Sequence, residues 1–162
     1  MRDIAVNETE DYEWLIELFK RNGLEVPDED EVPTDLVAQW EAVSGGERVG
    51  GCVLALREGR HIIDGIAVEE PFRGRGIGEA LLGRAIDEMA RRGGTELFLV
   101  ARAPGFFRKQ GFVETPREEA PVFFECFGCP QYGVDCFPEV MRYRRNLKLT
   151  NNGANPLPFS RE

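Results

Sequence analysis

The sequence predicts a single α/β domain in which a mixed central β-sheet is flanked by helices. The chain has 162 residues, the usual size of one domain with a substantial hydrophobic core. Short apolar segments typical of strands alternate with segments whose apolar residues recur at helical spacing. Turns rich in glycine or proline separate these segments. We expect residues 1–149 to form the domain and residues 150–162 to be a flexible tail.

The first half of the chain is expected to supply one helix and a strand hairpin. A short strand at residues 2–6 precedes a helix capped by Asn7 and Glu10, which ends at Asn22-Gly23. One face of this helix is apolar, through Tyr12, Leu15, Ile16 and Phe19. The acidic segment 25–35 contains two prolines and is expected to be a surface loop. Residues 36–43 and 48–58 are predicted strands, joined by a hairpin turn at Ser44-Gly45-Gly46.

The second half is expected to alternate strands and helices. Residues 61–68 are rich in β-branched side chains and indicate a strand. From Ile77 the apolar residues keep helical spacing until Gly93-Gly94 stop the helix. A strand at 95–100, a short helix at 103–110 with Pro104 near its start, and a strand at 111–115 follow. A cysteine-containing insertion at about 117–137 then precedes the last strand.

Composition and charge narrow the class of protein. Hydrophobic residues make up 42% of the chain and charged residues 30%, as in ordinary soluble domains. The net charge of −9 argues against a general binder of nucleic acid or of anionic membranes, because phosphate contacts need a basic surface. No apolar run is long enough to span a bilayer, and the first residues do not resemble a signal peptide. A cytoplasmic location is therefore expected.

A glycine-rich stretch directly before a helix is the strongest functional signal. Residues 73–78 read Arg-Gly-Arg-Gly-Ile-Gly between a predicted strand and a predicted helix. A helix N-terminus has unpaired N–H groups and a positive dipole end, so it attracts anions, and glycines leave these donors uncovered. The stretch does not match the dinucleotide-binding pattern Gly-x-Gly-x-x-Gly, because Glu79 occupies the position of the third glycine. The chain also has no Gly-Lys-Ser/Thr sequence of a P-loop. The alternative is a glycine-rich turn that only connects strand to helix.

Two blocks resemble the GNAT superfamily of N-acetyltransferases. Residues 62–93 resemble its acyl-CoA-binding core, and Ala103–Phe112 resemble its helix-strand signature, with Phe106, Lys109, Gly111 and Phe112 matching. The resemblance implies a GNAT-type mixed sheet and acetyl-CoA as co-substrate. It also implies a pyrophosphate loop at Arg73, Gly74, Arg75, Gly76, Ile77 and Gly78, a pantetheine-binding strand edge at Ile66, Ala67 and Val68, and coenzyme contacts from Phe107 and Lys109.

The implied reaction is direct attack of an amine on the thioester in a ternary complex. Phe107 stands where many members of the family have a tyrosine that protonates the leaving thiolate, so acid assistance from this position is excluded. A backbone N–H near Ala67 or Val68 would polarise the carbonyl. Asp64 is the first candidate for the base, followed by Glu69 and Glu70, although Asp64 could equally be a solvated or capping carboxylate. The alternative function is a CoA-binding regulatory module with little turnover.

Three cysteines, Cys126, Cys129 and Cys136, follow the second block. Their spacing predicts a structural zinc or iron–sulfur site, for which His61, Cys52 or Asp135 would supply the fourth ligand. The alternative is a turn-rich insertion with reduced thiols. A metal- or redox-responsive interaction protein is a second alternative function.

A further likeness concerns the acceptor. Phe106-Phe107, the cysteines and Glu139 resemble the amino-acid acetyltransferase branch of the family, which includes N-acetylglutamate synthases. This likeness implies an amino-acid acceptor whose carboxylate an arginine binds, either Arg102 or Arg142. The alternative for Arg142 is a solvated position beside Arg144 and Arg145. The expected partners are a small-molecule amine and, as an open option, a second copy of the chain.

Overall fold

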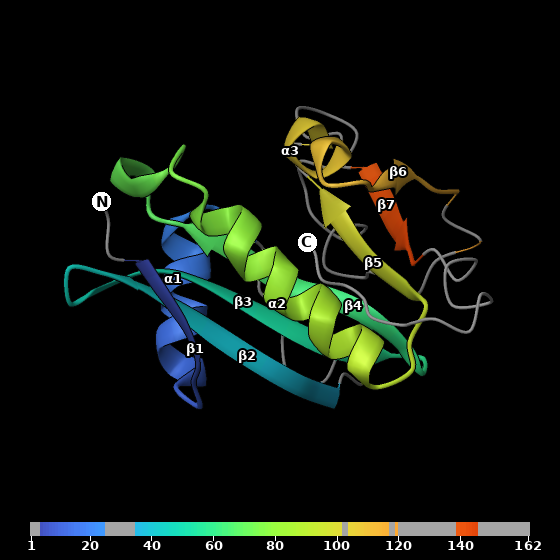
Figure 1. Cartoon of the computed structure of the whole chain (residues 1–162), viewed down its shortest axis with the longest axis horizontal. Coiled ribbons are helices and arrows are strands. Elements are labelled where there is room, and N and C mark those ends of the chain that lie inside the picture. The colour runs from blue at the N-terminus through green and yellow to red at the C-terminus, as the bar shows by residue number, and fades with distance from the viewer. Residues whose placement is uncertain (1–3, 25–34, 102–103, 117–118, 120–138, 146–162) are drawn as a thin grey trace, which may run out of the picture.

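The computed structural model describes residues 4–24, 35–101, 104–116, 119 and 139–145. Its strands form one mixed sheet in the order β1-β2-β3-β4-β5-β7-β6 (Figure 1). Neighbouring strands are antiparallel except β4 and β5, which are parallel. The bounds are β1 Ile4–Glu8, β2 Asp35–Ser44, β3 Glu47–Arg57, β4 Arg60–Val68, β5 Glu96–Ala101, β6 Val113–Glu114 and β7 Glu139–Arg144. The predicted fold class is confirmed.

Helices cover both faces of the sheet (Figure 1). The long helix α2 (Ile77–Arg91) lies across one face, where its buried residues pack with Trp40, Leu54 and Leu99 in the main hydrophobic core. Phe107 of the short helix α3 (Pro104–Lys109) belongs to the same core. Helix α1 (Tyr12–Arg21) covers the opposite face with its buried residues Leu15, Leu18 and Phe19. A turn of 3₁₀ helix, η1 (Glu70–Phe72), leads from β4 towards α2.

Several boundaries differ from the sequence-based expectation. The first strand continues to Glu8 because Asn7 and Glu8 still pair with β2, so Asn7 cannot cap α1. Asp11 caps the helix instead, since its carboxylate accepts a hydrogen bond of 3.2 Å from the Trp14 N–H. The strand expected at 111–115 is reduced to β6. Most of the predicted acidic loop, nearly all of the cysteine-containing insertion and the predicted tail lie outside the described residues.

Strand β4 is irregular at the point that matters for function. Val53 of β3 pairs with Gly65, and the adjacent Leu54 pairs with Ile63, so Asp64 is an extra residue in β4. This β-bulge bends the strand and changes the direction of the following side chains. On its other side β4 pairs with β5 only through Ile62 and Phe98. Beyond that pair the two strands separate and leave the end of β4 with one open edge.

Among the described residues no helix combines the length and the apolar character needed to cross a membrane. The longest, α2, has 15 residues and carries charged side chains on its exposed face. The predicted cytoplasmic location stays a prediction.

Candidate active site

The gap between β4 and β5 opens into a cavity of about 650 Å³. The glycine loop (residues 73–78) and the start of α2 form one wall, and α3 and the end of β5 form another. The chain that leaves α1 completes the lining. The lining residues are Asn22, Leu24, Ile63–Val68, Phe72–Gly74, Gly76–Glu79, Leu99, Val100, Phe106 and Phe107.

The open edge of β4 offers backbone groups to this cavity. The N–H of Glu69 donates to Val49 O at 2.8 Å, so Glu69 faces β3. Backbone groups alternate in direction along a strand, and therefore Ala67 also faces β3 whereas Val68 and Ile66 face the open edge. The carbonyl of Val68 accordingly accepts a bond from Arg73 instead of from β3. Of the two residues considered for carbonyl polarisation, Val68 presents its N–H to the cavity and Ala67 does not.

The glycine loop leaves the first turn of α2 uncovered. Gly74 and Gly76 have φ angles of +81° and +83°, a conformation that residues with a side chain rarely adopt. Gly76 is the N-cap of α2 and has no side chain to occupy the free N–H groups. A Cβ built on Gly76 would meet nothing within 4 Å. The loop therefore presents helix N–H donors to open space, as the anion site predicted from the sequence requires.

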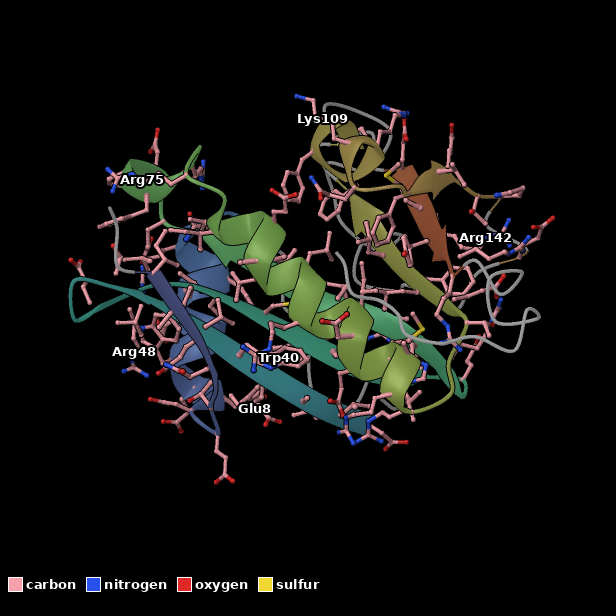
Figure 2. The ribbon with its side chains drawn as sticks, in the orientation of Figure 1. Glu8, Trp40, Arg48, Arg75, Lys109 and Arg142 are labelled. Carbon is pink, nitrogen blue, oxygen red and sulfur yellow. The ribbon has the colours of Figure 1, made fainter. Side chains whose placement is uncertain are left out.

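The two arginines of the loop behave differently from each other. Arg73 Nε donates to Val68 O at 2.8 Å, and its Nη2 donates to Asn22 Oδ1 at 2.7 Å. Arg75 stacks over the Phe72 ring at 5.2 Å and is not among the lining residues (Figure 2). Both arginines were expected to place positive charge around an anion, but both also make contacts within the protein.

Asp64 lies at the β4 bulge and lines the cavity. Arg57 Nη2 lies 3.4 Å from Asp64 Oδ1, and the Arg57 side chain is completely buried. Helix α1 brings Tyr12 near the same carboxylate. Burial raises the pKa of Tyr12, and the negative charge of Asp64 raises this pKa further. The bulge thus places the Asp64 carboxylate between the cavity and the buried guanidinium of Arg57. The contact with Arg57 helps to fix the orientation of this carboxylate.

Five other predicted residues are not among the lining residues. Glu69 binds Arg21 at 2.7 Å, and this hydrogen bond is the main reason that the pKa of Glu69 is lowered. Arg142 lies 3.5 Å from Glu96 and 3.6 Å from Glu119. Lys109 ends α3 and points outward (Figure 2). Arg75 was described above, Glu70 is also not among the lining residues, and Arg102 lies outside the described residues.

Phe107 faces the cavity as an apolar wall. Its ring packs edge-on against Phe106 at 5.0 Å and against Phe112 at 5.7 Å. A Cβ on Gly78 would lie 3.3 Å from Phe106 Cζ, so this glycine allows α3 to approach the start of α2. Among the described residues that line the cavity there is no tyrosine, cysteine, histidine or lysine.

The predicted metal ligands Cys126, Cys129 and Cys136 lie outside the described residues. Cys52 is fully buried in β3, and burial raises the pKa of its thiol. The described part of the chain gathers no group of three or more histidine, cysteine or acidic side chains that could hold a metal ion.

Sequence reasoning missed several lining residues. Asn22 was seen only as a helix end, and nothing local indicates that it reaches a loop 51 residues further on. Glu79 was noticed only because it breaks a dinucleotide fingerprint. Phe106 could have been included, since it belongs to the same signature as Phe107. Leu99 and Val100 become part of the site because β5 diverges from β4 after Phe98.

Comparison with known proteins decides the family. The profile of the Acetyltransferase (GNAT) family matches residues 3–112, more than half of the chain. The chain belongs to the GNAT acetyltransferase family. The predicted membership in this family is thereby confirmed, whereas the activity of this protein stays a prediction. An uncharacterised N-acetyltransferase from Chlorobaculum tepidum is 32% identical over 89 residues, which are 53% of this chain and 57% of that protein.

Solved structures support the GNAT fold. N-acetylglutamate synthase from Neisseria gonorrhoeae, complexed with coenzyme A and N-acetyl-glutamate, superposes with a TM-score of 0.66 at 18% identity. This match covers 89% of the present chain but only 35% of the synthase. A GNAT-family acetyltransferase from Staphylococcus aureus gives a TM-score of 0.65 at 18% identity and covers 89% and 100% of the two chains. These likenesses concern the fold alone.

Proposed function

We propose that the protein transfers the acetyl group of acetyl-CoA to a primary amine of a small molecule, by direct attack in a ternary complex. The observation that carries the proposal is the single cavity in which the open edge of β4, the glycine loop and Asp64 meet. In this arrangement the N–H groups at the start of α2 bind the pyrophosphate. The open backbone edge at Ile66 and Val68 binds the pantetheine arm, and Phe107 packs beside the thioester.

The proposed reaction needs few groups from the protein. The neutral amine attacks the thioester carbonyl carbon, a C–N bond forms, and the C–S bond breaks to release the CoA thiolate. The Val68 N–H stabilises the negative charge that develops on the carbonyl oxygen. Asp64 accepts the proton lost by the amine, directly or through one water. Holding both reactants in one cavity supplies a further share of the rate.

The acceptor is proposed at the level of a primary amine, with amino acids as one class within it. The N-acetyl-glutamate in the Neisseria synthase complex motivates the inclusion of glutamate in any screen. An acceptor carboxylate would need a free cation, however, and Arg142 is held between Glu96 and Glu119. Amines without a carboxylate therefore belong in the same screen.

The decisive experiment is a screen of amines with acetyl-CoA, followed by release of free thiol. We expect turnover with at least one amine, and Asp64→Asn should lower kcat/KM by about 10²–10⁴-fold. The matched control is Asp87→Asn, the same change at an exposed position of α2.

Two outcomes would contradict the proposal in different ways. Undiminished turnover in Asp64→Asn would remove Asp64 from the reaction but leave the activity intact. Tight binding of CoA without turnover of any amine would favour the regulatory module instead. That alternative is motivated by Phe107, which cannot protonate a leaving thiolate.

A further inference from the structure

The side chain of Arg73 is held in two directions at once. Its Nε donates to the carbonyl of Val68 at the end of β4, at 2.8 Å. Its Nη2 donates to Asn22 Oδ1 at the end of α1, at 2.7 Å. A guanidinium is rigid and planar, so two such bonds fix both its position and its plane. This geometry is typical of a structural link, whereas a freely placed charge would need neither bond.

Asn22 uses both ends of its side-chain amide. While Oδ1 accepts from Arg73, Nδ2 donates to Leu18 O at 2.9 Å and to Glu69 Oε1 at 3.2 Å. Rotating the amide by 180° would set oxygen against two acceptors and N–H groups against the guanidinium, which fixes its orientation. Asn22 therefore joins the last turn of α1 to the residues on either side of η1.

Helix α1 gives this link a rigid base. Leu15 and Leu18 are completely buried against the sheet, and Phe19 is 3% exposed. Glu69, the second partner of Asn22, is also bound by Arg21 of the same helix. The contacts from α1 thus hold the chain at both Glu69 and Arg73, immediately before the glycines.

We propose that Asn22 and Arg73 form a brace that positions the glycine loop at a fixed distance from Val68. The proposal rests on the proposed function and assigns Asn22 as a positioning residue and Arg73 a geometric role. The pantetheine arm of acetyl-CoA, when extended along β4, sets the distance between the pyrophosphate and the thioester. A displaced loop would therefore shift the thioester carbonyl along β4, away from the Val68 N–H. A displacement of about 1 Å can cost about a hundredfold in rate.

The test separates the effect of the positive charge of Arg73 from the effect of its two hydrogen bonds. Arg73→Lys keeps the positive charge, but one ammonium cannot reproduce the two divergent bonds of the guanidinium. We expect its Kd for acetyl-CoA to rise about tenfold or more, with kcat at saturating coenzyme falling as well. Arg84→Lys is the matched control: it makes the same change in α2, at a guanidinium that donates to Val6 O at 2.7 Å and does not line the cavity. Its Kd should change less than threefold.

Asn22→Ala removes the other half of the brace. It should weaken coenzyme binding to a similar extent, and the double variant Arg73→Lys/Asn22→Ala should be no worse than the weaker-binding single variant. In the protein without coenzyme, amide hydrogen exchange at Phe72 and Arg73, whose N–H groups donate to Glu69 O and Glu70 O, should become about tenfold faster in Asn22→Ala. Asn22→Ala also removes a helix cap, so Arg73→Lys, which leaves α1 intact, gives a reading independent of helix stability.

The outcomes separate this proposal from the proposed function. Coenzyme binding by Arg73→Lys equal to that of the wild type would overturn the brace, because charge alone would then suffice. Additive losses in the double variant, or unchanged exchange at Phe72 and Arg73, would overturn it as well. Failure of the wild-type protein to bind acetyl-CoA would instead refute the proposed function, while the exchange experiment would still decide whether the brace exists.

Discussion

Gly65 follows the bulge of β4 and lies directly beneath Phe19 of α1. A Cβ on Gly65 would lie 2.5 Å from Phe19 Cε2 and 2.8 Å from both Cδ2 and Cζ. These atoms belong to a rigid ring that is 3% exposed, so they cannot give way as the tip of a flexible chain would. Gly65→Ala therefore has to displace α1. Overpacking of this kind costs about 1–3 kcal/mol, and the lower entropy of the unfolded alanine chain offsets about 0.5–1 kcal/mol of it.

Urea unfolding of four proteins measures the effect: the wild type, Gly65→Ala, Phe19→Leu and the double variant. Leucine lacks the part of the ring that the new methyl group meets, so Phe19→Leu should cost about 1 kcal/mol alone and relieve the clash in the double variant. We expect the double variant to be more stable than the sum of the single changes by about 1 kcal/mol or more.

The control is Gly83→Ala in α2, where a Cβ meets nothing within 4 Å. This change should stabilise the protein by up to about 1 kcal/mol, because alanine favours a helix more than glycine does. If Gly65→Ala were as stable as the wild type, or if its effect simply added to that of Phe19→Leu, the steric argument would be refuted.

Four other predictions follow from the site and its surroundings. Gly76→Asp should fold but bind the coenzyme about a hundredfold more weakly by calorimetry. The new carboxylate and the pyrophosphate, about 5 Å apart, would repel by about 3 kcal/mol at an effective dielectric constant of about 20. Gly76→Asn adds a side chain of the same size without the charge, so equal binding by both variants would contradict the reasoning. Phe107→Tyr should leave kcat within about tenfold, and a gain of several hundredfold would show that the natural enzyme lacks an acid it could use. Cys129→Ser should lose metal and thermal stability together if the cysteines bind metal, while acetyl transfer persists in the folded variant; complete loss of transfer would place the thiols in the active site. Burial, and secondarily the charge of Arg92, lower the pKa of His61 in the folded protein. The unfolded chain therefore takes up the proton first, and the free energy of unfolding should decrease as the pH falls through about 6.5. His61→Gln should reduce this decrease in denaturation curves between about pH 7.5 and 5, and an unchanged pH dependence would count against the argument.

The glycine loop could be predicted from the sequence because its signals are local. A strand, three glycines and an amphipathic helix follow one another within one short stretch of the chain, and each has its own composition. The cap of α1 was predicted wrongly because the local signal is ambiguous there. Asn7 and Asp11 are both suitable N-caps, and only the pairing of Asn7 with Glu41 of β2 decides between them.

The bulge in β4, the gap beside it and the different roles of the two loop arginines could not be predicted in this way. The bulge at Asp64 depends on the register between β3 and β4, and the gap beside Val68 depends on where β5 diverges. Both arginines of the loop look equivalent in the sequence, yet only Arg73 has Asn22 within reach. Such assignments follow from tertiary contacts that no local pattern contains.

The single pairing of Ile62 with Phe98 has a consequence for the stability of the whole domain. It is the one strand pairing, among the described strands, between β1–β4 and the group β5, β7 and β6. Otherwise side chains hold the two groups together, beneath α2 on one face and through Ala55, Ile62, Phe98 and Val140 on the other. A coenzyme bound along the edge of β4 would add a second connection across the same boundary. At about 100 times its Kd it would raise the free energy of unfolding by about 2.7 kcal/mol, and amide protection in β5 should increase with it.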